Sequence, residues 1–173
     1  MTYTPQHIAN YFLDRAEAEG RTLGHMKVQK LVYIAYGWYL ALTGERLFNE
    51  PIQAWQHGPV IRSLYDEFKH YVNRGITERA TELNLDTWDE VVPRVDPADT
   101  MVELVLGKVW AAYNRFSGWQ LRQKTHEPET PWSLTYDPGE RDKIIPDELI
   151  RPHFSDIIKR ILDAATAPSA AAA

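Results

Sequence analysis

Six histidines are the side chains of this chain best suited to metal binding or to acid–base catalysis. They are His7, His25, His57, His70, His126 and His153. No two are four residues apart, so no helix can present a pair of them on one face as the helical zinc motif of metalloproteases does. His126-Glu127 begins such a motif, but Pro128 follows at once and stops helix formation. We therefore expect no metal site, and we interpret His57 and His126 as hydrogen-bonding residues that fix their loops.

Hydroxyl nucleophiles have no better support in the sequence. An activated serine or threonine needs a neighbouring base and a third group that orients this base. Ser63, Ser117, Ser133 and Thr125 all lie outside any glycine-flanked turn of the kind that exposes a nucleophile. Cysteine is absent, and so is a glycine-rich phosphate-binding loop. We predict a protein that is not an enzyme and uses no cofactor, with a hydrolase based on His57 or His126 as the alternative.

The balance of charges argues against a nucleic-acid-binding role. The 173 residues carry 19 lysines and arginines against 24 aspartates and glutamates, which gives a formal net charge of -5. Aromatic residues make up 12% of the chain, and a surplus of aromatic side chains is typical of protein-binding surfaces. The first residues lack the basic and then apolar pattern of a secretory signal. We therefore expect a cytoplasmic protein with no membrane contact.

Polar and aromatic residues beside rigid turns are the better candidates for function, because they suit the binding of another protein. The candidates are Lys27, Gln29, Lys30, Trp55, His57, Gly58, Pro59, Arg62, Tyr65, Thr125, His126 and Trp132. Each also has a structural interpretation. The polar residues at positions 27–30 fit a solvated helix end, and Trp55 and Trp132 fit a hydrophobic core. We favour these structural interpretations for most of the helix-end residues and for the tryptophans, whereas the loop positions 56–59 and 125–131 are the better functional candidates.

A buried central helix must position most of these candidates. Not one residue between Leu31 and Leu42 is charged, and apolar side chains recur there with helical spacing. The charge-free stretch is too short for the roughly 20 residues that cross a bilayer. We predict a helix that begins between Thr22 and Met26, ends at Thr43-Gly44, and is surrounded by other elements.

The remaining pattern predicts a mainly α fold, a compact helical bundle around this central helix. Flanking helices are expected from Thr4-Pro5 to Gly20, from Pro59 to about residue 72, from Asp96-Pro97 to Phe116, in a short segment capped by Ser117 and Gln120, and beyond Pro146. We expect at most a small β-hairpin near residues 47–58, a short helix and loops within 76–100, and an ordered loop from Thr125 to Asp147. We assign one domain to residues 1–165 and a flexible alanine-rich tail to 166–173.

Three sequence blocks resemble the Panacea-domain family, also called the GepA-like or DUF4065 family. The first runs from Lys27 to Tyr39, the second from Leu47 to Tyr65, and the third joins Thr125-His126 to Pro131-Trp132 and Ile145-Pro146. Each block is weak alone, but three blocks in the right order and spacing are specific. Val28 replaces the leucine that is usual in relatives, which is a mild apolar change.

The resemblance implies a mostly helical antitoxin domain, without known catalysis, that silences a cognate protein toxin by direct binding. In one branch of the family the antitoxin is similar to a proteolytic adaptor that presents its toxin to the ClpXP protease. A DNA-binding autorepressor is the alternative, although the chain has no appended part for that task. The family fixes this role more firmly than it fixes the identity of the toxin.

Overall fold

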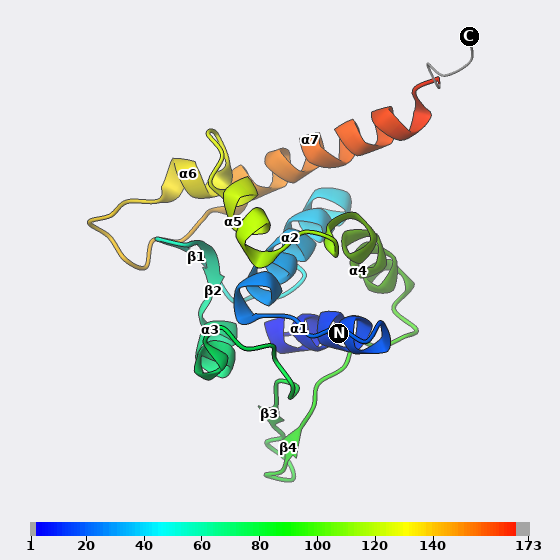
Figure 1. Cartoon of the computed structure of the whole chain (residues 1–173), viewed down its shortest axis with the longest axis vertical. Coiled ribbons are helices and arrows are strands. Elements are labelled where there is room, and N and C mark those ends of the chain that lie inside the picture. The colour runs from blue at the N-terminus through cyan, green and yellow to red at the C-terminus, as the bar shows by residue number, and fades with distance from the viewer. Residues whose placement is uncertain (1–2, 169–173) are drawn as a thin grey trace.

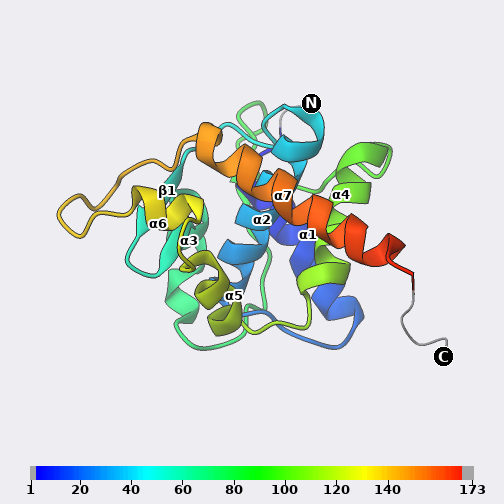
Figure 2. The same cartoon turned by 90° about the horizontal axis from the view of Figure 1, so that it is seen from above.

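Helix α2 (His25–Thr43) is the centre of the computed structural model, which describes residues 3–168 (Figure 1). Val28, Leu31, Val32 and Ala35 have no exposed surface at all. The helix is covered by α1 (Pro5–Ala18), α4 (Thr100–Tyr113), α5 (Gly118–Thr125) and α7 (Asp147–Thr166). Figure 2 shows α7 lying across α2. The predictions of a mainly α fold and of a buried central helix are confirmed.

Local signals end or begin several helices as predicted. Pro5 occupies the first position of α1, directly after Thr4. Gly44 ends α2 with a φ of 76°, a left-handed conformation that glycine adopts at little cost. Ser117 and Gln120 exchange hydrogen bonds in a capping box at the start of α5. These termini needed only local hydrogen bonding, which is why the sequence alone located them.

The small β-hairpin lies near the predicted residues, but it ends at Ile61 and not at residue 58. Strand β1 (Ile52–Trp55) pairs antiparallel with β2 (Gly58–Ile61), with Ile52 opposite Ile61 and Trp55 opposite Gly58. Pro59 therefore lies within a strand and does not begin a helix. Helix α3 starts at Arg62, ends at Phe68, and continues as a 3-10 turn over Lys69–Tyr71. A proline suits the first turn of a helix and an edge position of a strand equally well, so pairing with β1 decides the outcome.

Three further predictions need correction. Residues 76–99 contain no helix, and they form a small hairpin of β3 (Glu82–Leu83) and β4 (Glu90–Val91). Helix α4 begins at Thr100, because the Asp99 carboxylate accepts a hydrogen bond from Val102 N–H in place of the predicted Asp96 cap. The predicted loop after Thr125 contains a short helix, α6 (Pro131–Thr135), whose cap is Thr130.

The C-terminal end of the described chain is formed by α7. Helix α7 extends to Thr166 and its last turns leave the helical body (Figure 1). The predicted tail begins at that residue, and its last five residues, 169–173, lie outside the described range. The domain limit at residue 165 and the flexibility of the tail therefore stay predictions. Within residues 3–168, no helix combines the length and the apolar character that a membrane crossing requires.

Gly37 lets α7 approach α2 closely. A Cβ atom at this position would lie 2.0 Å from Cδ2 of the buried Phe154 ring. We predict that Gly37→Ala lowers the free energy of unfolding by about 1–3 kcal/mol through overpacking. Gly107→Ala in α4 is the matched control, since only the Tyr11 hydroxyl lies near its Cβ, at 3.7 Å. The control should be unchanged or about 0.5–1 kcal/mol more stable. Urea denaturation of both variants would contradict the prediction if their stabilities changed equally.

Candidate functional site

The predicted site residues lie where the start of α2 meets the β1–β2 hairpin and the α5–α6 segment. The side chains of Gln29 and Lys30 come from α2, and Gly58 and Pro59 come from β2. Thr125, His126 and Trp132 approach the same hairpin from α5 and α6. Arg62 and Tyr65 follow directly in α3. The structure therefore brings together most of the predicted set.

Gln29 binds the backbone at the end of β2. Its side-chain amide donates to the Ile61 carbonyl at 2.9 Å, and its amide oxygen accepts from Ile61 N–H at 2.9 Å. Gln29 is only 4% exposed and Ile61 is fully buried. A buried backbone group without a partner costs about 1–3 kcal/mol, so this pair of bonds holds β2 in an extended conformation against α2.

Lys30 supports the next part of the strand. Its ammonium group donates to the Pro59 carbonyl at 2.9 Å, and the residue is only 2% exposed. Gly58 has a φ of 106°, and a Cβ at this position would lie 2.8 Å from Lys30 Nζ and 3.0 Å from Thr125 Oγ1. Glycine is therefore required by both the backbone conformation and the space. Lysine is almost never fully buried without an ionic partner, so Lys30 is unusual.

The α5–α6 segment holds the hairpin from its other side. Trp132 Nε1 donates to the Trp55 carbonyl at 2.7 Å. The ring nitrogens of His126 face two carbonyl oxygens, that of Arg122 at 2.7 Å and that of Gln56 at 3.1 Å. A neutral imidazole carries one N–H, so it donates to one of these at a time. Burial lowers the pKa of His126, which favours this neutral form. His126 thus acts as the predicted loop-fixing residue.

The interpretation of positions 27–30 as a solvated helix end was wrong for two of the residues. Gln29 and Lys30 are buried, and Lys27 is half-buried with a pKa lowered by burial. Trp132 is core, as favoured, whereas Trp55 is half-buried and borders a surface cleft. The cause is that the sequence does not show which buried backbone groups a polar side chain will bind. Without that knowledge, a polar residue at a helix end is expected to face solvent.

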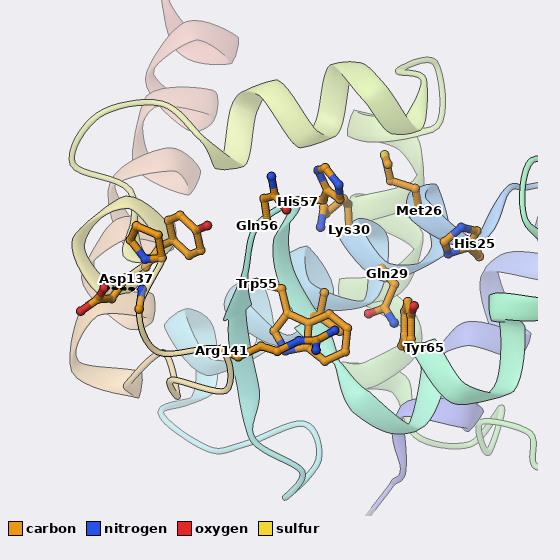
Figure 3. A pocket seen from close by; sticks show the side chains of 14 residues that line it. His25, Met26, Gln29, Lys30, Trp55, Gln56, His57, Tyr65, Asp137 and Arg141 are labelled. Carbon is orange, nitrogen blue, oxygen red and sulfur yellow. Dashed lines mark hydrogen bonds between the residues drawn. The ribbon is translucent and has the colours of Figure 1, made fainter.

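A cleft of about 470 Å³ opens beside the hairpin, and its walls combine aromatic and basic side chains (Figure 3). The residues that matter most for its chemistry are Trp55, Tyr65, His57, Lys30, His25 and Arg141. The Trp55 and Tyr65 rings meet edge to face, with centroids 4.9 Å apart. The guanidinium groups of Arg62 and Arg141 lie 5.6 Å and 5.8 Å from the centre of the Trp55 ring. We call this the Trp55 cleft.

Sequence reasoning missed the wall formed by residues 136–141. Tyr136, Asp137 and Arg141 line the Trp55 cleft from the loop between α6 and α7. The Asp137 carboxylate accepts from Gly139 N–H at 2.8 Å and so stabilises a tight turn. The Asp-Pro-Gly run is a recognisable turn signal, but it does not reveal that the turn faces Trp55, about 80 residues away in sequence.

The floor of the Trp55 cleft is electrostatically unusual. Burial, together with the nearby charge of Arg122, lowers the pKa of Lys30 from 10.5 to about 7. Burial and the charge of Lys30 also lower the pKa of His25. The buried Nδ1 of His25 has no hydrogen-bond partner among the described residues. The cleft therefore contains a buried amine and a buried imidazole nitrogen whose bonding capacity is not fully used.

The arrangement has the features of a binding surface. Ring nitrogens of His126 face backbone oxygens, and no serine or threonine lines the Trp55 cleft. Among residues 3–168, no three histidine or carboxylate side chains are grouped to hold a metal ion. Half-buried aromatic rings beside arginine side chains are, by contrast, the usual centre of a protein-binding surface.

Comparison with known proteins places the chain in a family. A family profile described as Antitoxin SocA-like, Panacea domain, matches residues 28–133. The chain belongs to this family. It is 28% identical to Antitoxin SocA of Caulobacter vibrioides (strain NA1000 / CB15N) over 139 residues, which cover 78% of this chain and 73% of the relative. No solved structure matches.

The family match has a direct structural meaning. The matched range begins within α2 and includes the hairpin, α3 and the α5–α6 contact, so it contains the side-chain hydrogen bonds of Gln29, Lys30, His126 and Trp132 to the hairpin. The backbone pairing of β1 with residues 143–145 lies outside it. Arg141 and the 136–141 wall lie outside it. In this SocA-like Panacea domain, the matched segment is therefore the frame, and part of the cleft wall is added by the segment that follows.

The two hydrogen bonds between the Gln29 side chain and the Ile61 backbone, which we call the Gln29 clamp, should be essential for the stability of this Panacea domain. We predict that Gln29→Leu lowers the free energy of unfolding by roughly 2–4 kcal/mol, because it leaves the buried N–H and carbonyl of Ile61 unpaired. Gln123→Leu, at an exposed position of α5, should change it by less than about 0.5 kcal/mol. Chemical denaturation checks both values, and equal effects would show that the clamp does not stabilise the hairpin.

Lys30 should make the stability depend on pH in a defined direction. Between pH 7 and 10 the unfolded chain holds a proton on this amine that the folded chain has lost, so raising the pH favours the folded state. We predict that the parent gains up to about 1.4 kcal/mol per pH unit relative to Lys30→Met over this range. Titrating groups that do not interact with Lys30 cancel in this difference. Urea titrations at pH 7, 8 and 9 would contradict the prediction if the difference stayed constant.

Proposed function

We propose that this chain is an antitoxin that neutralises a cognate protein toxin by binding it directly, through the surface that contains the Trp55 cleft. The observation that carries the proposal is the cluster of half-buried Trp55 and Tyr65 with exposed Arg141 at a surface cleft, in a member of an antitoxin family. Aromatic and arginine side chains provide most of the binding energy in protein interfaces. A cytoplasmic location and the absence of nucleic-acid binding belong to the same proposal.

The mode of neutralisation is proposed to be occlusion of the toxin, with delivery of the bound toxin to the ClpXP protease as the alternative. Both modes begin with the same complex, so they share the Trp55 cleft as a contact. They differ in the fate of the toxin, which persists in the first mode and is degraded in the second. The name of the relative, Antitoxin SocA, supports the antitoxin role and not one mode over the other.

Neutralisation should be visible in growing cells. The candidate toxin is the product of a gene adjacent to that of this chain, and its expression alone should arrest growth. We predict that co-expression of the parent chain restores growth, and that the two proteins copurify as a stable complex. The Trp55 and Tyr65 rings pack on each other at the surface, so Tyr65→Ala should weaken the rescue, whereas Leu42→Ala, at an exposed apolar position of α2, should not.

The half-life of the toxin in these cells separates the two modes. A half-life that falls on co-expression, and that recovers when ClpXP is removed, would identify delivery to the protease. An unchanged half-life with restored growth would identify occlusion. Growth arrest that persists despite abundant, folded antitoxin would reject the proposed function.

A further inference from the structure

The Trp55 cleft is a basic hollow in a chain whose net charge is negative. Arg141 at its mouth is exposed and forms no ion pair within the described residues, although it lies over the Trp55 ring. Arg62 differs, because its guanidinium is already paired with the Asp66 carboxylate at 2.9 Å. Asp137 is the one carboxylate among the lining residues, and it accepts a hydrogen bond from its own turn. The cleft therefore has more positive than negative groups.

The buried groups at the floor of the cleft also lack a negatively charged partner. Lys30 can donate three hydrogen bonds, but the described residues give its ammonium one acceptor, the Pro59 carbonyl, and no carboxylate. Buried charges are ordinarily paired, because an unpaired charge in a dry site is costly. His25, whose buried Nδ1 has no hydrogen-bond partner among the described residues, lines the same cleft. An anionic group in the cleft would offset the charge of Lys30 and offer further acceptors to its ammonium group.

The backbone of the hairpin excludes a simpler mode of peptide binding. The outer edge of β1 is occupied, since Ala54 N–H donates to Lys143 O and Ile145 N–H donates to Ile52 O, both at 2.8 Å. The outer edge of β2 is occupied by the side chains of Gln29 and Lys30. A partner therefore cannot add a strand to this sheet. Recognition must come from side chains that enter the cleft.

We propose that the Trp55 cleft receives an acidic side chain from the surface of the toxin, together with an adjacent apolar side chain. The carboxylate pairs with Arg141 and approaches the floor formed by Lys30 and His25. The apolar neighbour packs on the rings of Trp55 and Tyr65 and excludes water from the ion pair. This inference rests on the proposed antitoxin function and names the chemistry of its central contact.

Isothermal titration calorimetry of the purified chain with the purified toxin tests the inference. Arg141→Glu should weaken binding about tenfold or more, because it places a carboxylate where the structure offers a guanidinium. Lys108→Glu is the matched control: it makes the same change in net charge at an exposed position of α4, with no hydrogen bond or ion pair in the described structure, and should change the affinity less than about twofold. Circular dichroism and thermal unfolding confirm that both variants fold.

A scan of the toxin identifies the occupant. Single Asp→Asn and Glu→Gln substitutions at the surface of the toxin should include one that weakens binding to the parent chain. The same substitution should not further weaken binding to the Arg141→Glu variant. A toxin lengthened by two residues at its C-terminus should bind as before. If the extension abolishes binding while no side-chain substitution matters, a chain-end carboxylate occupies the cleft and the inference is overturned.

The outcomes separate this inference from the proposed function. If the toxin does not bind the parent chain at all, the proposed function fails and the inference fails with it. If the toxin binds and Arg141→Glu binds equally well, the antitoxin function stands and the acidic occupant is rejected.

Discussion

The whole site depends on how the backbone of one short strand is satisfied. Strand β2 lies against α2, where water cannot reach its polar groups, and each buried N–H or carbonyl needs a partner. Two consecutive side chains of α2 meet this need, since Gln29 binds both polar groups of Ile61 and Lys30 binds the Pro59 carbonyl. The outer edge of β2 is thus held by a helix, whereas the outer edge of β1 pairs with the backbone of residues 143–145. This explains how a four-residue strand pair is stable in a mainly helical protein.

The same constraint fixes the positions of the surface groups. Trp55 ends β1, and its carbonyl is held by Trp132, so the Trp55 ring projects beside α3 at a defined place. Tyr65 in α3 then meets that ring, and the turn around Asp137 brings Arg141 over it. A binding surface built on such a frame loses little conformational entropy when a partner arrives. The hydrogen bonds that make the hairpin rigid therefore also fix the side chains that line the cleft.

Sequence patterns identified the elements whose formation is local. The charge-free run of α2, its glycine end and the capping box of α5 depend on neighbours within a few residues, and they were predicted correctly. The start of α3 was not, because Gly58-Pro59 suits either a helix or a strand. The strand results from pairing with β1 and from the hydrogen bonds of Gln29, about 30 residues away. The prediction for residues 76–100 also failed, since the two-residue strands β3 and β4 leave almost no periodicity to detect.

For the site, sequence reasoning named residues most of which lie close together in the structure, but it partly misjudged what they do. The pattern at Lys27, Gln29 and Lys30 predicted a solvated helix end. Two of these side chains, Gln29 and Lys30, are instead buried and hydrogen-bonded to the backbone of β2. Arg141 was missed, because no local pattern shows that a turn crosses the chain to face Trp55. The two errors share an origin: both roles are set by contacts between distant segments. The blocks that carry the family resemblance include Gln29, Lys30, His126 and Trp132, which hold the hairpin, whereas Arg141 lies outside the matched range. In this chain the frame of the cleft and the arginine at its mouth therefore come from different segments.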